Sequence, residues 1–390
     1  MRLGLSLAAV LAAGISIWAD IRAPALNSRL CNAGFCRFDQ LFARVDAQGM
    51  NLTNVAKLID QDPMNPLVWS AYAELLASQG QRDEAAQIFP HAVALGPGMS
   101  PVLMRAANFD FAYGRIDHGI SMAREILMQT DAFDQILFAD LMHSRVPVPE
   151  LLGRAIPAQP RVARAWLAWA HAHGTAQEIS TTWSWMRQNM LADQHSAVDV
   201  TWALWERKSF RSAQKTWADW LDPSQGPYLN PERLANTRFA NESNSSPFDW
   251  TLTTPPSVQL SRRDGLEIRF SGTENVHFAQ VHQFATVEAG RYRLSVEVSA
   301  AGLTTDERPF FRVFDPVNPA RLDAATAPLS ENAAKSWLTL EFSVPPGTEV
   351  VQVQIERRAS RRFDNKIAGT VHLHQVSLLP AISDPRLPRR

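Results

Sequence analysis

A run of four arginines gives the chain its densest cluster of charged side chains. The run consists of Arg357, Arg358, Arg361 and Arg362, which lie within six residues. Guanidinium groups match carboxylates and phosphates in shape and charge, so a loop that presents all four would bind an acidic glycan or another anion. Glu356 and Asp364 flank the run. The alternative is therefore a solvated loop whose charges these carboxylates partly neutralise.

Aromatic and imidazole side chains suggest two further kinds of site. Trp250, in the sequence Phe-Asp-Trp, is either a platform on which a sugar ring stacks or a core residue at the beginning of a strand. His372 and His374 lie two residues apart in an expected strand and so share one face. With His277 or His282 from another strand they form a weak candidate metal site. Otherwise they belong to the polar outer face of a sheet.

Motifs of the common catalytic sites are missing from the sequence. It has no G-x-S-x-G elbow, no P-loop, no H-E-x-x-H pair and no G-x-G-x-x-G loop. No pair of carboxylates stands out as the acid and base of a glycosidase. We therefore expect a protein that is not an enzyme and that needs no cofactor.

Length and charge limit the possible classes of protein. The chain has 390 residues, of which 46% are apolar, and a net charge of −1. This length predicts two or three domains, and the apolar content supports sizeable cores. The balanced charge offers no electrostatic footprint for nucleic acid, which we exclude as a partner.

The N-terminus indicates export. After Met1 and Arg2, the sixteen residues from Leu3 to Trp18 carry no charge. At about 1.5 Å per residue such a run is short for a bilayer, so residues 1–20 are either a cleaved signal or a membrane anchor. We favour the anchor, which would tether the remaining chain to the inner membrane on its periplasmic or otherwise extracytoplasmic side.

Two cysteines follow this segment. Cys31 and Cys36 stand in the sequence Cys-Asn-Ala-Gly-Phe-Cys and are the only cysteines of the chain. An even pair behind an export signal is consistent with a local disulfide, and the alternative is two free thiols.

A repeat of 34 residues organises the next part of the chain. Residues 65–98 and 99–131 align at that shift. Small residues such as Ala73 and Ala85 suit positions where two helices cross, and Gly80 suits the end of a helix. The pattern consists of Trp69, Ala73, Gly80, Ala85, Phe89, Ala92 and Pro97. It resembles a tetratricopeptide repeat, which implies one helical hairpin per repeat and a solenoid that binds protein partners.

Tryptophans continue the repeat at spacings of 34 and 36 residues. These are Trp166, Trp169, Trp183, Trp202, Trp205 and Trp217. Such rings either fill the core or line a groove for a partner. Trp185 and Trp220 fall outside the regular positions and are our candidates for binding a protein partner. We assign residues 21–65 to a lead-in and helical cap, and 66–225 to the repeats.

The pattern of the chain changes after the repeats. Proline and glycine gather around residues 226–235, which we assign to a linker. From 236 to 380 apolar and polar residues alternate in short segments separated by turns, as in strands with one buried face. Residues 381–390 form a tail. The predicted fold is multidomain α plus β, in which an α-helical hairpin-repeat solenoid precedes an antiparallel β-sandwich.

Both ends of the strand-rich part carry a second resemblance. The opening ANTRFANESNSSPFDWTL and the ending IAGTVHLHQVSLLP resemble a jelly-roll module of the carbohydrate-binding, galactose-binding-like kind. The resemblance implies a jelly roll and a glycan ligand. A calcium site in that group draws carboxylates from the early loop and the last strand. Here the last strand offers Gln375 in place of an acid.

Together these features favour an exported, membrane-tethered and non-enzymatic scaffold in cell-envelope or exopolysaccharide assembly. Its helical repeats would bind a protein partner of the envelope. The alternative is a glycan-binding protein that uses the sandwich, with the repeats as a spacer. A glycan-active enzyme is the third class. Exposed aromatic rings on the sandwich would favour the second class, and a pair of facing acids would favour the third.

A fusion tests the expected location. A reporter enzyme that is active only outside the cytoplasm, fused after Arg390, is expected to be active because the uncharged run exports the chain. Retention of the fusion in membranes after a high-salt wash would identify an anchor, and release would identify a cleaved signal. Activity of a cytoplasm-only reporter at the same point would contradict export.

Overall fold

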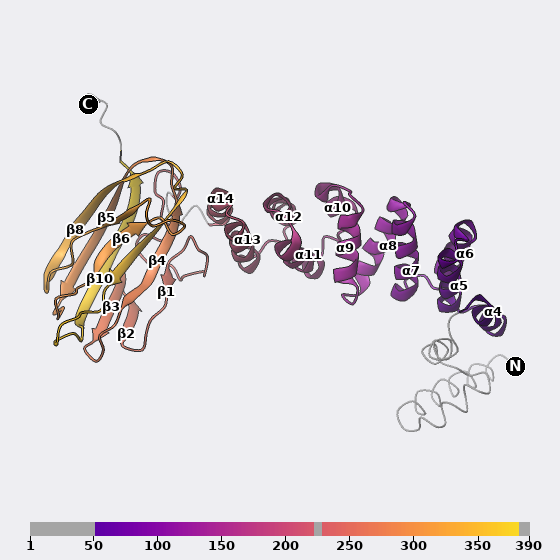
Figure 1. Ribbon diagram of the computed structural model, residues 1–390, viewed down its shortest axis with the longest axis horizontal. Helices are drawn as coiled ribbons and strands as arrows, with labels where there is room; N and C mark the ends of the chain where they lie inside the picture. Colours follow the sequence, from indigo (N-terminus) through magenta and orange to yellow (C-terminus); the bar gives the residue numbers. More distant parts are fainter. Residues whose placement is uncertain (1–50, 222–227, 382–390) are drawn as a thin grey trace, which may run out of the picture. The chain divides into compact units, whose positions relative to one another are not determined.

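The computed structural model describes residues 51–221 and 228–381 (Figure 1). The N-terminal segment, Cys31 and Cys36 lie outside these residues. Within them, no helix combines the length and the apolar character that crossing a bilayer requires. Contacts divide the chain into two compact units, Met1–Val162 and Ala163–Arg390. The second unit therefore combines the last helices with the strand-rich part.

Eleven helices, α4 to α14, precede the strands in the described residues. The first seven are α4 (Leu52–Gln61), α5 (Pro66–Ser78), α6 (Arg82–Leu95), α7 (Ser100–Ala112), α8 (Ile116–Gln129), α9 (Asp134–His143) and α10 (Val148–Arg154). The others are α11 (Pro160–His173), α12 (Ala176–Gln188), α13 (Gln194–Glu206) and α14 (Phe210–Trp220). The predicted helical architecture is confirmed.

The predicted hairpins are present at the predicted register. Helices α5 and α7 begin 34 residues apart, as do α6 and α8. Ala73 and Ala85, where small residues were expected, are fully buried. Gly80 and Gly114, at the turn of each hairpin, have φ of +85° and +75°. Glycine adopts that left-handed conformation at little cost, so each first helix ends there.

Tryptophans form much of the core in the helices of the second unit. Trp166, Trp183 and Trp217 are buried. The Nε1–H group of Trp166 donates to Thr182 Oγ1 at 3.1 Å, which satisfies its polar edge inside the core. Packing between helices thus accounts for these three tryptophans, whereas Trp202 is 36% exposed.

In the part of the chain that the structure describes, ten strands form two antiparallel five-stranded sheets, which lie face to face (Figure 1). One sheet has the order β1-β4-β9-β6-β7, with β1 (Thr251–Leu252), β4 (Phe278–Thr286), β9 (Val350–Arg357), β6 (Phe310–Phe314) and β7 (Asp323–Ala325). The other has the order β2-β3-β10-β5-β8, with β2 (Val258–Arg262), β3 (Leu266–Ser271), β10 (Ala368–Pro380), β5 (Gly290–Ala301) and β8 (Ala333–Val344). The predicted antiparallel β-sandwich is confirmed.

The core of the sandwich lies between the two sheets. Val351, Val353 and Ile355 of β9 and Val296 and Val298 of β5 belong to one buried apolar cluster. The residues between them point to the outer faces. Each sheet therefore has one apolar inner face and one polar outer face.

A buried amide fixes helix α14 to the C-terminal end of β4. Gln214 Oε1 accepts hydrogen bonds from the backbone N–H of Thr286 at 2.6 Å and from its hydroxyl. Gln214 Nε2 donates to the hydroxyl of Tyr228 at 2.7 Å and to the carbonyl of Arg233 at 3.1 Å. Because this amide is buried, all four contacts stabilise the joint. Residues of the assigned linker, 226–235, take part in it.

Ala85→Trp tests the hairpin packing. Ala85 is fully buried in α6, so an indole there overpacks the helix crossing and is expected to destabilise the protein by about 1–3 kcal/mol or more. Thermal denaturation measures the effect. Gln87→Trp, at an exposed position of the same helix, is the matched control and should melt near wild type. Equal melting of Ala85→Trp and wild type would refute the repeat register.

Candidate functional site

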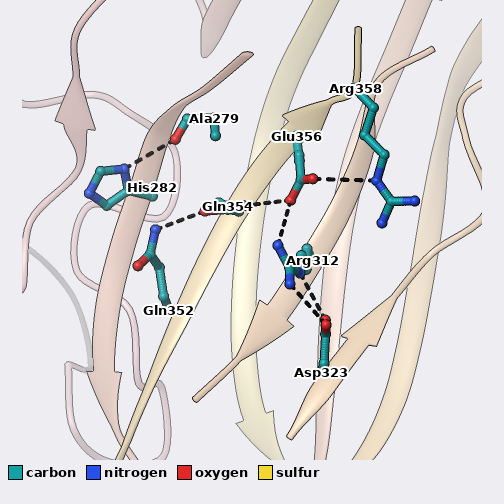
Figure 2. Close-up of polar contacts among 8 residues, drawn as sticks. All are labelled: Ala279, His282, Arg312, Asp323, Gln352, Gln354, Glu356 and Arg358. Carbon is teal, nitrogen blue, oxygen red and sulfur yellow. Dashed lines mark hydrogen bonds and ion pairs between the residues drawn. The ribbon is translucent and has the colours of Figure 1, made fainter. Parts of the chain in front are cut away.

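A polar row crosses the outer face of the sheet β1-β4-β9-β6-β7. In the register of the strands His282 of β4 lies opposite Gln354 of β9, and Gln354 lies opposite Arg312 of β6. Gln352, Gln354 and Glu356 occupy the outward positions of β9 (Figure 2). Three neighbouring strands thus bring amide, carboxylate, guanidinium and imidazole groups to one surface.

Hydrogen bonds along β9 fix the side chains of this row. Gln352 Nε2 donates to Gln354 Oε1 at 2.8 Å, and Gln354 Nε2 donates to Glu356 Oε2 at 2.7 Å (Figure 2). Gln354 and Glu356 are each only 4% exposed although they point away from the core. These hydrogen bonds consequently fix the orientations of the amides and the carboxylate.

Arginines hold the acidic end of the row. Arg312 bridges two carboxylates, with Nη1 at 3.0 Å from Glu356 Oε2 and Nε at 2.8 Å from Asp323 Oδ1. Hydrogen bonds with these carboxylates raise the pKa of Arg312, and its guanidinium lowers the pKa of Asp323. Arg358 Nε lies 3.6 Å from Glu356 Oε1. Two cations therefore balance two anions, so the face is suited to a ligand with hydroxyl groups more than to an ion.

Phenylalanines on the same face are covered. The guanidinium of Arg312 lies 4.6 Å from the ring centre of Phe314, and that of Arg358 lies 5.1 Å from the ring centre of Phe310. These cation–π contacts occupy the ring faces that a sugar would need for stacking. Recognition on this face thus depends on hydrogen bonds.

Arg357 does not belong to an exposed arginine cluster. Its side chain is fully buried, and burial lowers its pKa. The guanidinium donates to the carbonyls of Glu307 and Asn365 at 3.0 Å each, to Asn275 Oδ1 at 3.0 Å, and to the carbonyl of Val276. The prediction that one loop presents all four arginines is therefore wrong, because Arg357 clamps three loops together.

The other three arginines are exposed. Arg358 pairs with Glu356, and Arg362 Nε lies 2.9 Å from Asp306 Oδ2. Arg361 is exposed on the same loop between β9 and β10. The loop also presents Phe363, which is fully exposed. No contact in the structure tests whether these three arginines bind an anion, which stays a prediction.

The tryptophan candidates are placed differently from what we expected. Trp250 is 2% exposed, its ring packs against Phe239, and its Nε1–H donates to the carbonyl of Asn236 at 3.2 Å. It is a core residue, so the platform hypothesis for it is wrong. Trp185 and Trp220 are half-buried against the helical core. Whether they bind a partner remains a prediction.

Trp337 was overlooked. It lies on β8, and its side chain is 54% exposed. The alternation that places Leu338 and Leu340 towards the core places Trp337 on the outer face. The sequence therefore held the signal for an exposed indole.

The histidine pair lies on β10. The rings of His372 and His374 stack at 4.2 Å. His372 Nε2 lies 3.1 Å from the carbonyl oxygen of Asp264, and His374 Nε2 lies 3.2 Å from Ser299 Oγ. His282 belongs to the opposite sheet. Among the residues that the structure describes, no group of three potential metal ligands is found.

A groove of about 470 Å³ lies among α7, α8 and α9 of the first unit. Its lining includes Asn108, Phe111, Ile116, Ile136, Asp140 and His143. Ile136 is 53% exposed, and burial raises the pKa of Asp140. A groove lined by both apolar and polar side chains suits a segment of polypeptide.

These two parts define the architecture of the protein: helical-hairpin repeats followed by an antiparallel β-sandwich. No protein-family model and no curated protein matches the chain. Among solved structures, it is similar to one titled "CBM4 structure and function", with 18% identity, coverage of 38% of this chain and 99% of the other, and a TM-score of 0.28.

Two further similar structures are helical. YrrB, described as a TPR protein with an unusual peptide-binding site, has 14% identity and a TM-score of 0.24, with 42% of this chain and 89% of the other covered. PilF of Pseudomonas aeruginosa has 14% identity and a TM-score of 0.24, with 43% and 80% covered. At such identities the likeness concerns the fold alone.

Arg357→Ala tests the clamp. Removing this guanidinium leaves several buried carbonyl oxygens unpaired, so the sandwich is expected to lose about 3 kcal/mol or more of its free energy of unfolding. Urea denaturation measures the loss. Arg361→Ala, four residues further on at an exposed position, should stay within about 0.5 kcal/mol of wild type. Similar stability of both variants would contradict the clamp.

Proposed function

We propose that the protein is a non-enzymatic scaffold of cell-envelope or exopolysaccharide assembly that holds a polysaccharide on the sandwich and a protein partner on the helical hairpins. The observation that carries the proposal is the row Gln352, Gln354 and Glu356. Its amides and carboxylate are bonded to one another and oriented outwards. The amides can donate to and accept from sugar hydroxyls, and the carboxylate can accept from them.

The helical groove supports the protein-binding half of the proposal. The groove has a volume of about 470 Å³ and includes the exposed Ile136, which suits the side chains of an extended or helical segment. Export through residues 1–20 is part of the same proposal, since envelope polymers are assembled outside the cytoplasm. A glycan-binding protein whose repeats act as a spacer is the second candidate. It needs the same polar row but leaves the groove empty.

The electrostatics of the row favour holding a sugar over cleaving it. A glycosidase needs one carboxylic acid whose pKa is raised enough to donate a proton. Asp323 and Glu356 face the same guanidinium, that of Arg312, which lowers the pKa of Asp323. Asp323, whose pKa is lowered, is therefore ionised and paired with Arg312, which suits orientation of a ligand and does not suit general acid catalysis.

Replacing the two glutamines tests the proposed function. The variant Gln352→Ala with Gln354→Ala loses two amides, each worth about 0.5–1.5 kcal/mol in a hydrogen bond, so retention of the full chain on polysaccharide is expected to fall about tenfold or more. Affinity electrophoresis through gels containing laminarin, galactan or dextran measures it. Gln259→Ala, an exposed glutamine of β2 on the opposite sheet, is the matched control. Unchanged retention of the double variant, with a normal melting temperature, would refute the role of the row.

A further inference from the structure

The outer face of the second sheet carries an open aromatic ring in a regular polar setting. Trp337 of β8 is 54% exposed, whereas Trp166, Trp217 and Trp250 are buried. In the register of the strands it lies opposite Glu297 of β5, and Glu297 lies opposite Gln375 of β10. Strands are about 4.8 Å apart, so the indole, the carboxylate and the amide follow one another across three strands.

Contacts hold the polar members of this row in place. Lys335 Nζ lies 3.3 Å from Glu297 Oε2. Gln375 Oε1 accepts a hydrogen bond from Arg238 Nε at 3.3 Å, which leaves the amide nitrogen of Gln375 as a donor. The side chain of Glu297 is 23% exposed, and that of Lys335 is 52% exposed. The row therefore offers fixed donors and acceptors beside an uncovered ring face.

We propose that Trp337, Glu297, Gln375 and Lys335 form a subsite for one neutral sugar unit of a polysaccharide. The apolar face of the sugar ring packs on the indole, and its hydroxyls exchange hydrogen bonds with the carboxylate, the amide and the ammonium group. Lys335 and Glu297 pair with each other, so these two charges suit the hydroxyls of a neutral sugar. The flat surface of a sheet admits an extended polymer whose neighbouring units leave on either side.

This subsite is separate from the row Gln352, Gln354 and Glu356, because the two lie on different sheets and face away from each other. They also differ in chemistry. On the first sheet arginines cover the phenylalanine rings, so binding there uses hydrogen bonds. On the second sheet the ring is open, so stacking contributes. The inference rests on the proposed binding of a polysaccharide by the sandwich, and it does not need the first row to bind.

Titration of the full chain tests the subsite. Laminarin, galactan, dextran and hydroxyethylcellulose serve as neutral probes, with tryptophan emission and affinity electrophoresis as readouts. At least one probe is expected to change the emission of the wild type. Trp337→Ala should weaken binding of that probe tenfold or more, which corresponds to about 1.4 kcal/mol. Trp337→Phe keeps a ring and should recover part of the affinity, which a purely structural role would not predict.

Matched variants distinguish binding at the subsite from binding at the first row. Phe363→Ala removes another exposed aromatic side chain, which lies in the loop between β9 and β10 and outside the proposed subsite. This variant should bind like wild type. If Trp337→Ala binds every probe like wild type, or if no probe changes the emission, the subsite is refuted. If the double glutamine variant loses binding while Trp337→Ala does not, the proposed function stands and this inference fails. The reverse result supports the inference and refutes the role of the first row.

Discussion

The position of the last helix on the sandwich depends on one buried amide. Gln214 uses its oxygen and its nitrogen, and its four partners come from β4 and from residues 228–233. Leaving such an amide unbonded would cost about 1–3 kcal/mol, so α14 is held at one place along the strand. Trp205 of α13 adds ring contacts with Phe248 and Phe284. One end of the outer face is thereby covered, and the polar row lies next to the covered end.

A second buried polar side chain also needs hydrogen-bond partners, at the C-terminal end of β9. Arg357 continues the inward phase of Val353 and Ile355, so its guanidinium enters a region where water does not reach. Backbone carbonyls and Asn275 supply the acceptors that water would otherwise supply. The base of the loop between β9 and β10 is fixed as a result, while Arg361 and Phe363 remain at the surface. The charged side chain of Arg357 thus serves packing, whereas the side chains of Arg361 and Phe363 do not.

Periodicity explains why much of this fold was predictable. The spacing that placed Ala73 and Ala85 at helix crossings follows from the geometry of a hairpin, and alternation placed the strand faces. Applied one step further, alternation also puts Arg357 inside and Trp337 outside. Four arginines within six residues suggested a solvated loop. We therefore predicted an exposed Arg357, although the alternation of β9 places it inside. Trp250 was ambiguous because an aromatic residue at a first strand suits both a core and a platform.

The polar row needed information that no local pattern holds. Gln352 and Glu356 are outward by phase, but their value as a site comes from Arg312, which β6 places beside them across a register that the sequence does not specify. That pairing also decides the chemistry of the face. Because Arg312 and Arg358 lie over Phe314 and Phe310, the first sheet offers hydrogen bonds without stacking. In the described part of the chain no guanidinium lies over Trp337 of the second sheet, and Lys335 pairs with Glu297. The first sheet therefore presents polar groups beside covered rings, and the second presents polar groups beside an exposed indole.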